Sequence, residues 1–198
     1  SKSSQEIIRK EISVKDAIFT ISYTDNKLDD IVNYSTLVLN DLITSSNSSD
    51  IYEINLYLDS NMEYGVLGMA SWSTKEIWLN ENEIDNESYL NDVVQKSSSI
   101  TLIHEILHIF GLIGVGTLGE QLIQDDSSYK KYVYIGNIGI EKYKNILTNN
   151  NFSYRNIFDI PIENNFDSGT ILSHFEEGLK DDFKTEYRFI NDIYHPSI

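Results

Sequence analysis

The chain contains no cysteine among its 198 residues. Disulfide bridges and thiolate zinc sites are therefore excluded. No apolar run approaches the roughly 18 residues that a membrane-spanning helix needs. The first ten residues also lack the apolar segment of a signal peptide. We therefore expect no transmembrane segment and no disulfide-stabilised fold.

Positive charge is also scarce, with 15 Lys and Arg residues against 31 Asp and Glu residues and a net charge of -16. Proteins that bind nucleic acid or anionic membranes carry clustered Lys and Arg, so this balance argues against both partners. The chain is nevertheless 40% hydrophobic and 12% aromatic, which is enough for a core. Its length suits a single domain.

The first half of the chain alternates predicted strands with predicted helices. Enrichment in β-branched and aromatic residues, or alternation of apolar and polar residues, predicts strands at residues 17–24, 52–59, 64–72 and 75–82. Helical spacing of apolar residues predicts helices at residues 25–46, 88–110 and 137–147. The remainder after residue 111 is loop-rich. We expect a strand-and-helix layer, then an irregular part, with the chemistry in a cleft between them.

The most informative segment is HEILHIFGLIG, residues 104–114. His104 and His108 are four residues apart, so on a helix both imidazoles can point at one zinc ion at about 2.0–2.1 Å. Glu105 is rotated by about 100° from His104 and can instead reach a metal-bound water as a general base. Gly111 is a residue type that commonly ends a helix in the left-handed conformation. The alternative is a purely structural histidine pair, but the apolar flanks make its burial costly unless a metal compensates.

A catalytic zinc site keeps three protein ligands and one open position, so a third ligand is needed. The candidates are His174, His195, Glu120 and Glu141. A glutamate on a following helix would complete a thermolysin-like site, and Glu141 lies on such a predicted helix. A compact metzincin site would place its ligand at Gly114, which has no ligating side chain. His195, near the end of the chain, is expected to be a tail residue.

The segment HEILHIFGLIG, followed downstream by PIENNFDSGTILSHFEEG at residues 161–178, resembles the leishmanolysin-like metalloproteases of the metzincin clan. In that family an insertion separates HExxHxxG from a third ligating histidine in a segment that runs Pro, apolar, Glu, a Gly-rich run, Gly-Thr, two residues, Ser-His-Trp-Glu. The chain matches this order with Pro161, Ile162, Glu163, Gly169, Thr170, Ser173, His174, Phe175 and Glu176, where Phe175 replaces the tryptophan. The resemblance covers about residues 50–178.

The resemblance implies a metzincin-type α/β (α+β) fold in one catalytic domain. A twisted sheet and two helices would form an N-terminal lobe of residues 1–114, and an irregular C-terminal lobe of residues 115–198 would carry His174. The implied function is a zinc-dependent endopeptidase acting on peptides or proteins. It would hold one Zn²⁺ per chain through His104, His108 and His174, with Glu105 as the base. The family resemblance also favours a secreted or extracellular location.

Two further expectations follow from the same comparison. The strand at residues 65–72 would lie at the sheet edge beside the cleft, where an extended peptide can pair with it. The family also places a methionine-containing turn after its third histidine, whereas Met62 and Met69 both precede the motif. We therefore expect the chain to stop before that turn. The alternatives are a zinc-bearing but inactive binding module and a thermolysin-like peptidase that uses Glu141.

Overall fold

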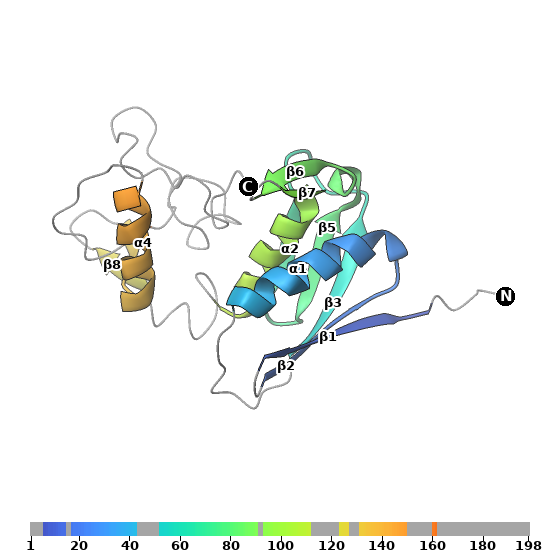
Figure 1. The fold of residues 1–198 in the computed structure, drawn as a ribbon, viewed down its shortest axis with the longest axis horizontal. Helices are drawn as coiled ribbons and strands as arrows, with labels where there is room; N and C mark the ends of the chain where they lie inside the picture. The colour runs from blue at the N-terminus through green and yellow to red at the C-terminus, as the bar shows by residue number, and fades with distance from the viewer. Residues whose placement is uncertain are drawn as a thin grey trace. The chain divides into compact units, whose positions relative to one another are not determined.

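The computed structural model describes residues 6–14, 17–42, 52–90, 93–111, 123–126, 131–149 and 160–161. The chain divides into two compact units, Ser1–Ile109 and Phe110–Ile198. The first unit is a mixed α/β layer with a five-stranded sheet (Figure 1). The mixed α/β class agrees with the expectation from the sequence.

The five strands of the first unit form one mixed sheet in the order β1-β2-β3-β5-β4. They are β1 (Ile8–Val14), β2 (Ala17–Tyr23), β3 (Tyr52–Asp59), β4 (Gly68–Ser71) and β5 (Glu76–Asn80). The three central strands are parallel, whereas β1 and β4 run antiparallel to their neighbours. Among the strands of this sheet, β4 is therefore the edge that follows β5.

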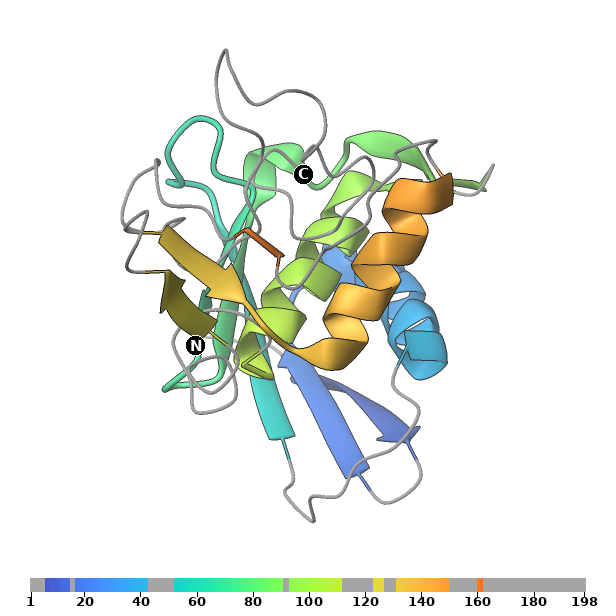
Figure 2. The same ribbon diagram turned by 90° about the vertical axis from the view of Figure 1, so that its left-hand side faces the viewer.

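Two helices, α1 (Asp29–Leu42) and α2 (Ser97–Ile109), cover the same face of this sheet (Figures 1 and 2). Along β3, Ile54 and Leu56 are buried while Glu53 and Asn55 are exposed, which is the alternation of a sheet with one covered face. The core therefore lies between the sheet and the two helices. Its fully buried side chains include Ile21, Ile54, Leu56, Ile77, Leu79, Ile31, Leu39, Leu102, Ile106 and Ile109.

A serine hydroxyl joins the two helices. Ser35 of α1 is fully buried, and its Oγ lies 2.7 Å from the carbonyl oxygen of Ile31 and 2.9 Å from that of Ser99 on α2. The hydroxyl has a single hydrogen, so it donates to one of these oxygens at a time. The small side chains of Ser35 and Ser99 allow the two backbones to approach closely at this point.

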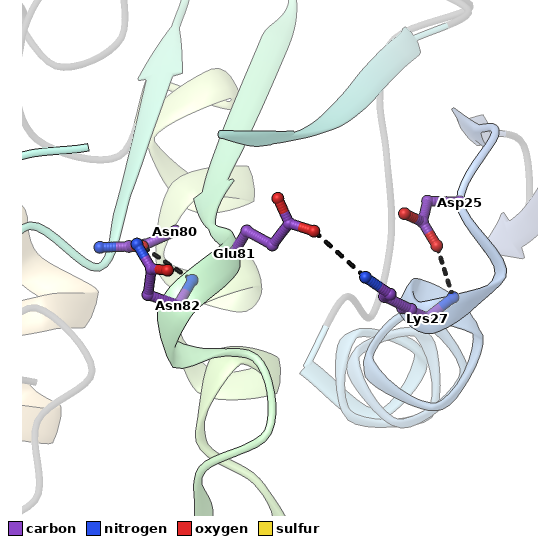
Figure 3. Close-up of polar contacts among 5 residues, drawn as sticks. All are labelled: Asp25, Lys27, Asn80, Glu81 and Asn82. Atoms are coloured by element: carbon purple, nitrogen blue, oxygen red, sulfur yellow. Dashed lines mark hydrogen bonds and ion pairs between the residues drawn. The ribbon is translucent and has the colours of Figure 1, made fainter. Parts of the chain in front are cut away.

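Two short 3-10 helices flank the sheet, η1 (Asn26–Leu28) after β2 and η2 (Glu81–Glu83) after β5. Figure 3 shows that Asp25 caps η1 by accepting a hydrogen bond from the backbone nitrogen of Lys27 at 3.0 Å. The Nζ atom of Lys27 lies 3.1 Å from Oε1 of Glu81, which connects the two turns. This ion pair is solvent-exposed, so its contribution to stability is small.

Asn80 fixes the chain where it enters β4. Its Oδ1 accepts a hydrogen bond from the backbone of Asn82 at 3.0 Å (Figure 3), and its Nδ2 donates to the carbonyl of Val66 at 2.8 Å. Its backbone nitrogen also donates to the carbonyl of Leu67 at 3.0 Å. Asn80 is only 4% exposed, so these bonds are made away from bulk water. One buried side chain therefore holds both the turn after β5 and the segment before the edge strand.

The element predictions for the first unit are confirmed at most places. The predicted strands correspond to β2, β3, β5 and the shorter β4, and the predicted helix at residues 25–46 corresponds to α1. Strand β1 was not predicted. The predicted helix at residues 88–110 is wrong in its first part, because β6 (Glu87–Leu90) and β7 (Val93–Lys96) form an antiparallel hairpin there. Tyr89, Val93 and Val94 favour strands, and this preference outweighs the helical spacing.

The second unit contains β8 (Ile123–Asp126), β9 (Lys131–Tyr134), β10 (Ile160–Pro161) and helix α4 (Asn137–Asn149). The helix confirms the prediction at residues 137–147. The buried ring of Tyr134 lies against Gly136 and Gly139, where an added Cβ atom would collide with it. None of the helices in the described ranges is long and apolar enough to span a membrane.

Candidate metal centre

Helix α2 carries the His-Glu-x-x-His segment near its C-terminal end. Its fully buried apolar residues are Leu102, Ile103, Ile106 and Ile109, which pack against the sheet and α1. Leu107 and Phe110 also match the helical spacing of a core-facing stripe, but they are only half-buried. Packing of this buried stripe orients the helix about its axis. The directions in which His104, Glu105 and His108 leave the helix are thereby set.

The helix ends close to the glycine that the sequence singles out. The last helical residue is Ile109, and Gly111 follows with φ of 74°, in the left-handed region. Only glycine adopts this conformation without a steric penalty from Cβ. The prediction that Gly111 ends the helix is therefore confirmed.

The two histidines of α2 bring their ring nitrogens together. The Nε2 atoms of His104 and His108 lie 3.0 Å apart, and the rings meet edge to face with centroids 4.6 Å apart. In a tetrahedral zinc site with Zn–N bonds of about 2.05 Å, two ligand nitrogens are separated by about 3.3 Å. The two rings therefore fit zinc after a shift of a few tenths of an ångström. His104 is 7% exposed and His108 is half-buried, so the pair is partly shielded from solvent.

Glu105 is buried beside this pair, with 7% of its surface exposed. Burial raises the pKa of its carboxyl group to about 8, because the charged form loses hydration. Among the described residues, no three His, Cys, Asp or Glu side chains form a group that could hold a metal.

Sequence reasoning did not identify the neighbours of Glu105. A Cβ atom built on Gly68 of β4 would lie 2.8 Å from Cγ2 of Thr101 and 3.3 Å from Cγ of Glu105. The backbone of the edge strand thus lies directly against α2 at Glu105. Gly68 and Glu105 are 37 positions apart in the sequence, and no local pattern connects them.

The register of β4 shows which of its backbone groups face the sheet edge. The Asn80 nitrogen bonds to the Leu67 carbonyl, and Met69 lies opposite Trp78 in the same antiparallel ladder. Hydrogen-bonded pairs alternate along such a ladder, so Leu67 and Met69 direct their N–H and C=O groups toward β5. Gly68 and Ala70 consequently direct theirs away from β5, at the edge beside α2.

Of the remaining candidate ligands, only Glu141 lies within the described residues. His174, His195, Glu120 and Gly114 lie outside the described residues, as does the rest of the resembling segment beyond Pro161. Glu141 is described: it lies on α4, is exposed, and forms an ion pair with Lys144 at 2.9 Å. The structure thus brings the ring nitrogens of His104 and His108 together and places Glu105 on the same helix.

Comparison of the chain with protein-family models, with curated proteins and with solved structures gave no match. The functional assignment consequently depends on the geometry of α2 and β4 and on the sequence motifs.

Proposed function

We propose that this protein is a zinc-dependent endopeptidase. The observation that carries the proposal is the approach of the His104 and His108 Nε2 atoms to 3.0 Å on a buried helix. Two neutral imidazoles at this separation are a strong donor pair for zinc. One Zn²⁺ per chain would be held by His104 and His108, with His174 as the third ligand that the resemblance to the leishmanolysin-like family implies.

Glu105 is the proposed general base. When bound, zinc acts as a Lewis acid that lowers the pKa of a water and polarises the scissile carbonyl. Glu105 would accept a proton from the attacking water, whose hydroxyl would bond to the acyl carbon, and would pass that proton to the leaving amine as the C–N bond breaks. Burial favours this role because it raises the proton affinity of the carboxylate. A nearby cation favours the charged form and so keeps the base ionised.

The proposed substrate is an extended peptide that pairs with β4. Gly68 and Ala70 direct their backbone N–H and C=O groups to the outer edge of the described five-stranded sheet, and outward-facing groups of this kind are what strand addition uses. Backbone hydrogen bonds depend little on the side chains of the peptide, so this pairing alone would allow substrates of many sequences.

The proposal includes a metzincin-type fold. Its support is the mixed sheet with two covering helices and an antiparallel edge strand. Further support is the end of the metal-binding helix before Gly111. Both features are those that the family resemblance implies.

The decisive experiment compares Glu105→Gln with the zinc-loaded wild type on a mixed peptide library, with cleavage followed by mass spectrometry. The substitution keeps the shape of the side chain and removes the base, so zinc content should be unchanged. The cleavage rate should fall by at least about 10²–10⁴-fold, the usual contribution of a general base.

Glu53→Gln is the matched control, because Glu53 is an exposed carboxylate on β3. It should cleave at the wild-type rate. Glu105→Gln protein that retains most of the activity would overturn the mechanism. Wild-type protein that binds zinc but cleaves no peptide would favour a binding module on a protease-like fold.

A further inference from the structure

We propose that Gly68 is a positioning residue that sets the distance between the edge strand and Glu105. The inference rests on the proposed peptidase function and concerns one aspect of it, the alignment of a strand-paired peptide with the base. It goes beyond the zinc-binding motif, because Gly68 lies in neither histidine segment and bears no functional group.

The geometry around Gly68 leaves no room for a side chain. A Cβ atom at this position would lie 2.8 Å from Cγ2 of Thr101, 3.2 Å from the carbonyl oxygen of Trp78 and 3.3 Å from Cγ of Glu105. A separation under 3.0 Å forces a displacement, and the other two contacts are tighter than ordinary van der Waals distance.

Two of these three neighbours cannot easily move. Thr101 is 6% exposed, and as a β-branched residue it is restricted at χ1. The Trp78 carbonyl belongs to the backbone of β5, which pairs with β4. A methyl group on residue 68 would therefore push β4 away from α2 or displace the Glu105 side chain. Either response changes the distance between the strand backbone and the carboxylate.

Gly68 also directs its own N–H and C=O groups away from β5, to the outer edge of the sheet as the described strands form it. The residue whose Cβ position borders Glu105 is thus one of the two that would hold a paired peptide. A substrate whose backbone pairs with Gly68 and Ala70 would thereby lie at a fixed distance from the Glu105 carboxylate. Displacement of a reacting group by about 1 Å can reduce a rate by about a hundredfold, so this contact has a direct kinetic consequence.

The test measures kcat, KM and zinc content of Gly68→Ala at a temperature where the variant is folded. We expect kcat to fall about ten- to a hundredfold. KM and zinc content should change much less, because the backbone groups of β4 and the ligands of α2 remain. The matched control is Ile54→Val, a stability-lowering substitution of a buried residue on β3, a strand that does not pair with β4. It should keep kcat within about twofold at a comparable loss of melting temperature.

A second substitution tests the contact itself. Thr101→Ser removes Cγ2, the atom nearest to the added methyl group, so Gly68→Ala/Thr101→Ser should recover much of the lost kcat. Should Gly68→Ala alone fail to fold, the comparison is made in the Thr101→Ser background. There the added methyl still meets the Trp78 carbonyl and Glu105, and kcat should fall threefold or more.

Three results would overturn the inference: an unchanged kcat in Gly68→Ala, a loss no greater than that of Ile54→Val, or no recovery with Thr101→Ser. If Gly68→Ala does not fold, an unchanged kcat on adding it to the Thr101→Ser protein would overturn the inference as well. In each case the wild type is active, so the proposed peptidase function would stand. An inactive wild type would instead overturn both proposals.

Discussion

The Nε2 atoms of His104 and His108 lie 3.0 Å apart, within hydrogen-bonding distance of each other. In the metal-free protein such a bond requires a hydrogen on one Nε2 and a lone pair on the other. A zinc ion bound by both rings, as proposed, would need the lone pairs of both nitrogens, so the ring that carries the Nε2 hydrogen would have to carry it on Nδ1 instead.

Zinc should bind at one ion per chain, and His108→Ala should reduce the metal content at least tenfold, because one of the two converging imidazoles is lost. Elemental analysis of protein purified without chelator measures this directly. His195→Ala is the matched control and should keep the wild-type content. A metal content in His108→Ala equal to that of the wild type would contradict the proposed zinc site.

The third ligand can be assigned by comparing His174→Ala with Glu141→Ala. We expect His174→Ala to lose zinc and Glu141→Ala to retain it, because the carboxylate of Glu141 is exposed and already paired with Lys144. Zinc affinity of both variants can be measured by competition with a chromogenic chelator. The opposite pattern would replace the leishmanolysin-like assignment with the thermolysin-like one.

The metal-free protein should lose stability as the pH rises from about 4.5 to about 8. Burial raises the pKa of Glu105 from 4.5 to about 8, so the folded state holds this proton more tightly than the unfolded chain. The resulting stabilisation is complete when the pH is below the pKa that Glu105 has in the unfolded chain. It is lost as the pH rises through the pKa that Glu105 has in the folded protein. Its size is on the order of a few kcal/mol.

Melting curves of wild type and Glu105→Gln at pH 5 and pH 8.5 test this expectation. The wild-type melting temperature should fall by about 5–10 °C relative to that of Glu105→Gln over this interval. Glu53→Gln should follow the wild type, and added zinc should reduce the fall because a cation favours the carboxylate. Parallel curves for wild type and Glu105→Gln would contradict the shifted pKa.

Asn80→Ala should lower the free energy of unfolding by about 1–3 kcal/mol, because it removes two hydrogen bonds made by a buried side chain. Asn80→Asp keeps the acceptor for Asn82 and loses the donor to Val66, so it should also destabilise. Urea unfolding at pH 7 measures both. Asn82→Ala, at an exposed position of the same turn, should change stability by less than about 0.5 kcal/mol. Similar effects of Asn80→Ala and Asn82→Ala would contradict the role assigned to Asn80.

The parts of the site that the sequence predicts correctly depend on local spacing. His104 and His108 share a helix face because they are four residues apart, and Gly111 ends the helix because its conformation suits glycine. Both effects act within a few residues. The start of α2 was misplaced because Tyr89, Val93 and Val94 pair across a hairpin, and helical spacing does not register such pairing.

The parts that could not be predicted depend on contacts between distant segments. The approach of Gly68 to Glu105 requires the packing of an edge strand on a helix that begins 29 positions later. Likewise, the hydrogen bond from Asn80 to Val66 exists only because β4 and β5 pair. A glycine or asparagine in such a segment has many possible roles, and only the fold selects one.

The contact between the Ser35 hydroxyl and the Ser99 carbonyl also restrains the rotation of α2 about its own axis. Side-chain tips lie about 5–6 Å from a helix axis, so a roll of α2 by 10° would carry an imidazole nitrogen through roughly 1 Å. Because both imidazoles are on α2, a roll would turn them together relative to the sheet and α1. The contact of a buried serine on α1 with α2 therefore adds to the buried apolar stripe in restraining the rotation of the helix that carries His104 and His108.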